Sequence, residues 1–184
     1  MSFWNFANNL YKSVGTLVNN IMESTNPEEA NLNDFKTYWS TFLECISEVK
    51  QKDPQLVVDW VHTTHASDDL RDMIQLILEE ENRAMAKNKT SESPVEAGLC
   101  LEYFMQHRLL DELCEMAVSD TPKGMLNLVI ERITPLIRDL RYSLLSTNHF
   151  HKSVSSLITK SVYVYQHANP TKEFDQHLIS FIQV

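Results

Sequence analysis

Residues 122–158 read PKGMLNLVIERITPLIRDLRYSLLSTNHFHKSVSSLI, and this stretch decides the fold class. After Pro122 and Gly124, apolar residues recur three and four positions apart, which is the spacing of an amphipathic helix. A second amphipathic segment starts at His151, after a short polar connection. Two such segments in close succession predict a fold built from helices.

The first of these two helices carries proline signals at its start and in its interior. Thr121 followed by Pro122 predicts the cap and first turn of the helix. Pro135 lies further along, where its missing N–H predicts a kink or a break between Glu131 and Thr134.

Helical spacing extends along the rest of the chain, which has only 3 glycines and 6 prolines. Residues 24–31 and 86–93 are predicted to be linkers. The predicted helical segments are residues 2–22, 33–49, 55–62, 67–81, 94–105, 109–117, 121–140, 151–167 and 169–184.

Helices of modest length joined by short turns pack either as a bundle or as an α-solenoid. We expect the second arrangement, an all-α, armadillo- or HEAT-type stack of antiparallel helices. The predicted units are an N-terminal amphipathic helix at residues 1–23 and a helical domain at residues 33–184. The last helix is apolar to its end, so we expect the chain either to be the opening part of a longer solenoid or to dimerise there.

The chain is acidic, with 25 Asp and Glu against 16 Lys and Arg and a net charge of −9. Residues 23–120 hold 21 acidic and 8 basic residues, a balance of −13, whereas residues 121–184 hold 4 and 7, a balance of +3. This distribution makes a nucleic-acid partner unexpected. The acidic part is either a solvated surface or a docking face for a basic partner.

No spacing in the chain indicates catalysis or a cofactor, and no glycine-rich phosphate loop is present. Pairs of histidines, His149 with His151 and His62 with His65, lack the further ligands of a closed zinc site, so surface positions are expected. The chain is therefore expected to be neither an enzyme nor a metal or cofactor binder.

Three acidic residues in succession, Glu79 to Glu81, are predicted to form a solvated helix end, because successive helix positions diverge by about 100°. The cysteines, Cys45, Cys100 and Cys114, are odd in number and without close pairs. We expect reduced thiols in the core of a cytoplasmic protein.

The N-terminal segment has an apolar stripe that includes Phe3, Phe6, Leu10, Leu17 and Ile21. It is either a packing helix, a partner-binding helix or a helix that lies on a membrane. Its polar face carries only one basic residue, so the membrane alternative is weaker than the other two.

Several motifs in sequence order resemble the FTS- and Hook-interacting protein family. They span roughly residues 34–158: Asp34-Phe35 with Tyr38-Trp39, residues 77–82 (ILEEEN), residues 100–104 (CLEYF), residues 107–111 (HRLLD), residues 122–125 (PKGM), Leu144-Leu145, His151-Lys152, Val154 and Leu157-Ile158. The family usually has prolines at the positions of Ser146 and Ser153.

The resemblance implies a non-catalytic adaptor, of which this chain is the N-terminal portion. Such an adaptor links early endosomes to Hook proteins and through them to dynein–dynactin on microtubules. The implied partners are a Hook-like coiled-coil protein and an FTS-like subunit, with an endosomal Rab GTPase and a peripheral membrane contact as further candidates. The implied location is cytoplasmic, on early endosomes. His151 and Lys152 are the motif residues expected to be exposed, and we predict that they bind a partner.

Overall fold

The computed structural model describes residues 26–52, 59–87, 97–140, 148–168 and 171–183. Every regular element in these residues is an α-helix, which confirms the predicted all-α class. The helices are α2 (Pro27–Gln51), α3 (Trp60–Thr63), α4 (Ala66–Lys87), α5 (Leu99–Gln106), α6 (Leu109–Ser119), α7 (Met125–Asp139), α8 (Asn148–His167) and α9 (Lys172–Ile182). The predicted amphipathic helix at residues 1–23 lies outside the described residues.

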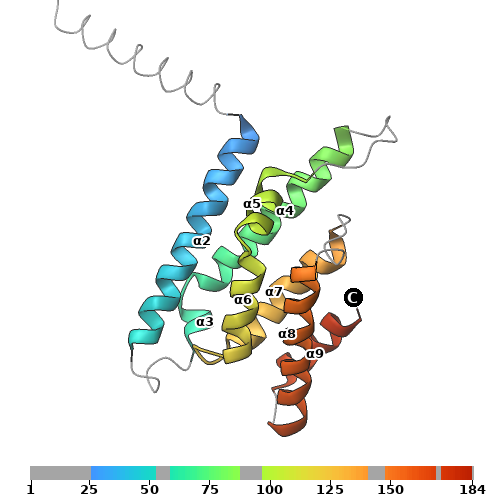
Figure 1. Cartoon of the computed structure of the whole chain (residues 1–184). Helices are drawn as coiled ribbons and strands as arrows, with labels where there is room; N and C mark the ends of the chain where they lie inside the picture. The colour runs from blue at the N-terminus through green and yellow to red at the C-terminus, as the bar shows by residue number, and fades with distance from the viewer. Residues whose placement is uncertain (1–25, 53–58, 88–96, 141–147, 169–170, 184) are drawn as a thin grey trace, which may run out of the picture.

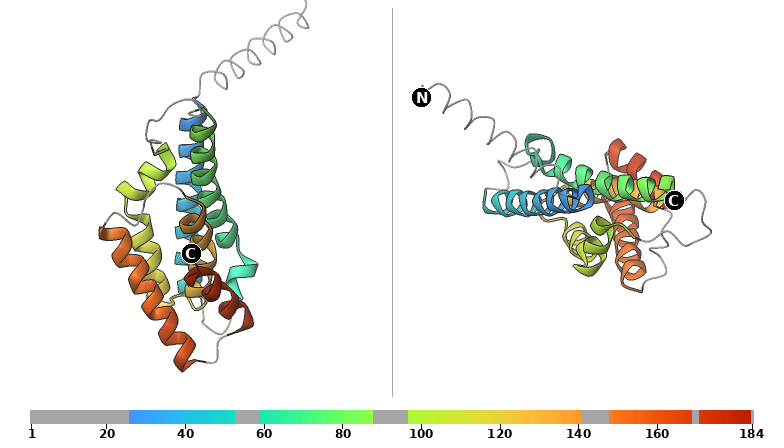
Figure 2. Two further views of the ribbon diagram at one scale, coloured as in Figure 1. Left: turned by 90° about the vertical axis from the view of Figure 1, so that its right-hand side faces the viewer. Right: turned by 90° about the horizontal axis from the view of Figure 1, so that it is seen from above.

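The helices form two layers (Figures 1 and 2). One layer holds α2, then α5 and α6, then α8, and the other holds α4, α7 and α9, so that each helix packs on the next one of its own layer. α2 and α4 lie side by side and run in opposite directions (Figure 1). This is the stacking of antiparallel helices that the sequence predicts.

Helices α6 and α8 run in the same direction, as alternate helices of such a stack do. Arg108, just before α6, contacts His149 in the first turn of α8, and Asp111 accepts a hydrogen bond from Ser153 one turn further along both helices. The chain returns between them through α7, which packs on α6.

A continuous apolar core lies between the two layers. Its largest fully buried side chains come from α2 to α7 and are Trp60, Phe35, Phe42, Phe104, Leu70, Met73, Ile77, Leu113, Met125, Leu128, Ile130 and Ile133. The Trp60 indole N–H donates to the Lys123 carbonyl (2.8 Å), so α3 is fixed to the turn before α7. A buried indole normally needs such an acceptor.

The start of α2 differs from the prediction, which placed a linker at residues 24–31. The helix already begins at Pro27, because Asn26 caps it by accepting a hydrogen bond from the Glu28 N–H (3.2 Å). Pro27 at the first position and acidic residues in the first turn favour this start.

The start of α7 also differs from the predicted cap at Thr121 and Pro122. The helix begins at Met125, and Asp120 supplies the cap by accepting from the N–H groups of Gly124 and Leu126 (3.0 Å each). Gly124 has a φ of 100°, a conformation that glycine adopts without strain.

A kink or a break was predicted near Pro135, and the break is absent because α7 is continuous across this residue. The Thr134 hydroxyl donates to the Ile130 carbonyl (2.6 Å) beside the proline. Eight buried residues of α7 hold the helix between its neighbours, which outweighs the loss of one backbone hydrogen bond.

Other helix starts were also misplaced. Helix α4 was expected to start at Ser67 but begins at Ala66, and α8 begins at Asn148, three positions before the predicted start at His151. Helix α9 was expected to start at residues 169–170, but its cap is Thr171, whose hydroxyl accepts from the Phe174 N–H (3.2 Å).

Candidate partner-binding surface

The contact between α6 and α8 is a polar seam built on the 107–111 motif. His107 ends α5, and Arg108 takes a left-handed backbone conformation with a φ of 55°, which turns the chain directly into α6 as predicted. From this position the Arg108 guanidinium donates to Asp111 (2.6 Å), and it also lies 3.3 Å from the His149 Nδ1.

Ser153 completes this seam, because its hydroxyl donates to Asp111. Ser153 therefore gives α8 a polar connection to α6.

His151 and Lys152 are both exposed on the first turns of α8, between the buried Phe150 and Val154. The expectation that they are exposed is confirmed. Their role in binding a partner stays a prediction.

The exposed large apolar side chains of the described residues all lie on α8 and α9, and Tyr163 of α8 stacks on His167. Ile158, Val162 and Tyr165 of α8 are 38%, 36% and 55% exposed, and Ile179 and Ile182 of α9 are 56% and 57% exposed. We call these five residues the end surface, because α8 and α9 are the last helices of the two layers (Figure 2).

The sequence showed only part of this surface. The apolar character of the last helix was recognised, but Phe174, Leu178 and Phe181 of that helix are buried while its two isoleucines are not. The residues of α8 were missed, although Ile158, Val162 and Tyr165 already follow a spacing of four and three.

The acidic triplet in α4 is not a solvated helix end. The helix continues to Lys87, and both Glu80 and Glu81 are buried. The Glu80 carboxylate accepts from the Cys100 N–H (2.9 Å) and lies 3.2 Å from the Cys100 Sγ, which donates to it. Since Gly98 at the cap of α5 has no side chain, Glu80 of α4 caps that helix instead.

All three cysteines are free and buried, as predicted for core thiols. Burial and the hydrogen bond to Glu80 raise the pKa of the Cys100 thiol far above its usual range. Burial, with a smaller effect of Asp111, raises the pKa of Cys114 to about 12. Neither thiol is therefore activated as a nucleophile.

The predicted surface histidines are also confirmed, since His62 and His65 are both exposed. His65 precedes α4 and pairs with Asp69, which in turn accepts from the Thr41 hydroxyl of α2 (3.0 Å). These contacts join α2 and α4. In the described part of the chain, no three His, Cys, Asp or Glu side chains form a group that could hold a metal ion.

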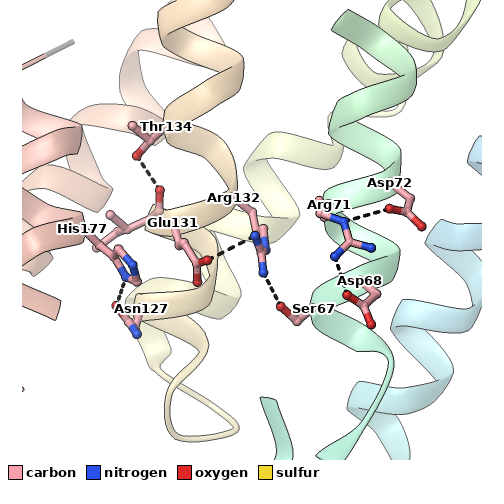
Figure 3. A network of polar contacts seen from close by, with 10 residues as sticks. Ser67, Asp68, Arg71, Asp72, Asn127, Glu131, Arg132, Thr134 and His177 are labelled. Carbon is pink, nitrogen blue, oxygen red and sulfur yellow. Dashed lines mark hydrogen bonds and ion pairs between the residues drawn. The ribbon is translucent and has the colours of Figure 1, made fainter. Parts of the chain in front are cut away.

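A second polar network connects α4, α7 and α9 (Figure 3). Arg132 of α7 donates to the Ser67 hydroxyl of α4 (2.7 Å) and pairs with Glu131 (3.1 Å), while His177 of α9 lies 2.9 Å from the Asn127 oxygen of α7. The Arg132–Ser67 and His177–Asn127 contacts cross from one helix to the next of the same layer, whereas the pair of Arg132 with Glu131 lies within α7. They hold that layer together and do not converge on a common point.

Within the described ranges, none of the helices combines the length and the apolar character needed to cross a membrane. No solved structure matches the chain. A family model does match residues 100–184, which run from the second residue of α5 to the C-terminus and include the polar seam and the end surface. Over these residues the chain is similar to the RAI16-like family, described as retinoic acid induced 16-like protein.

Proposed function

We propose that this protein is a non-catalytic adaptor that binds a Hook-like coiled-coil protein and an FTS-like subunit and so links early endosomes to dynein–dynactin. The match to the RAI16-like family over residues 100–184 carries this proposal, because that family is related to the Hook-interacting proteins. The motifs at 100–104, 107–111 and 122–125 and those between residues 144 and 158, which resemble the latter family, lie within the matched residues.

The architecture supports a binding role. Stacked helices present extended surfaces formed by several consecutive elements, which suits the recognition of long helical partners. The end surface adds exposed apolar side chains that can contribute to binding energy.

The polar groups of the interior support the non-catalytic part of the proposal. The buried Glu80 caps α5, Asp69 joins α4 to α2, and the buried hydroxyls of Thr134 and Ser161 donate to carbonyls of their own helices. Each of these groups serves a helix end, a helix contact or a helix turn.

The direct test is binding of the purified full chain to a purified Hook-like coiled-coil protein and an FTS-like subunit, measured by immobilising the chain and by size-exclusion chromatography. We expect a complex with at least one of the two proteins. If the chain is folded by circular dichroism and retains neither protein, the adaptor proposal is wrong.

The predicted contact residues are tested by His151→Ala with Lys152→Ala. Both side chains are exposed, so the fold should be kept. We expect binding of the Hook-like protein to weaken about tenfold, which corresponds to about 1.4 kcal/mol. The matched control is Gln166→Ala, which changes an exposed polar residue near the other end of α8. If the double variant and Gln166→Ala bind the Hook-like protein with equal affinity, His151 and Lys152 do not contact it.

The membrane alternative depends on residues 1–23, which lie outside the described residues. Liposome flotation of the wild type and of a Leu10→Glu, Leu17→Glu variant tests it. Flotation of the wild type that is lost in the variant would favour a peripheral membrane module.

A further inference from the structure

We draw no further inference here: the strongest candidate, the end surface on α8 and α9 with its exposed Ile158, Val162, Tyr165, Ile179 and Ile182, carries none because nothing in the described part of the structure shows what covers it.

Discussion

The side chain of Glu80 occupies the space beside Gly98 in which any other residue at position 98 would place its own side chain. A Cβ at residue 98 would lie 2.9 Å from the Glu80 Cβ and closer still to its carboxylate. That carboxylate accepts the N–H of Cys100 and caps α5. The contact between α4 and α5 therefore depends on the absence of one methyl group.

Gly98→Ala should lower the free energy of unfolding by about 2 kcal/mol, because the new methyl group displaces the capping carboxylate. Glu80→Ala should cost about the same, because it leaves a buried N–H without an acceptor. Chemical denaturation of both variants and of the double variant measures the coupling. We expect the double variant to lose less free energy of unfolding than the sum of the two single losses, because it no longer has the Glu80 carboxylate with which the added methyl group clashes. Additive losses would show that the two residues act independently.

Cys100 and Cys114 should resist alkylation in the folded protein. The pKa of Cys114 is raised to about 12, so at pH 8 only about one thiol in ten thousand is ionised, and the pKa of Cys100 is shifted in the same direction. Iodoacetamide labelling followed by peptide mass spectrometry, with and without guanidinium chloride, measures this. We expect labelling of both residues only in the denatured protein. Rapid labelling of Cys114 under native conditions would contradict its burial.

Asp120 lies in the connection between α6 and α7 and has two functions there. Its carboxylate caps α7, and its own φ of 48° lies in the left-handed region, which Asp and Asn tolerate better than other side chains. The loss of either function weakens the connection from α6 to α7.

Asp120→Ala should therefore destabilise the protein by about 2 kcal/mol, of which about half comes from the lost cap. Asp120→Asn keeps an acceptor oxygen and the tolerance for this backbone conformation, so its cost should be below about 0.5 kcal/mol. Thermal unfolding of the two variants measures the difference. Equal destabilisation by both would mean that the negative charge matters more than the hydrogen bonds.

The sequence indicated helices correctly because each amphipathic segment carries its own periodicity. Cap positions were less predictable, since Asp120 caps α7 from four positions before Gly124 and no local rule selects it over Thr121. The start of α2 could have been found, because Asn26-Pro27-Glu28 combines a capping residue, a proline at the first position and an acidic first turn.

The surface was harder to predict than the helices for a different reason. Whether Val162 or Ile179 is buried depends on which helices pack beside α8 and α9, and spacing alone does not show this. The burial of Glu80 likewise requires α5, which lies 20 positions further along the chain. His151 and Lys152 could be recognised as exposed because their immediate neighbours already define the buried side of α8.

For the protein as a whole, the two layers predict unequal stability along the stack. Helix α7 packs on α4, α6 and α9 and has eight buried residues, whereas α9 packs on α7 and α8 and has three. Hydrogen exchange should therefore be at least about tenfold faster in α9 than in α7, a difference of about 1.4 kcal/mol in local opening. Peptide-resolved exchange at neutral pH measures this. Equal protection of the two helices would indicate that the stack unfolds in a single step.

The exposed side chains in the middle of α2, which include Asp34, Ser40 and Glu44, are polar, and this has a consequence for how the protein is made. Helix α2 leaves the ribosome before the other described helices, with its outer side already suited to water. The apolar residues of the early helices then face only the side where α5, α6 and α7 will arrive. Each new helix finds a surface on which it can pack, so the described helices can assemble in the order of synthesis, from α2 towards α9.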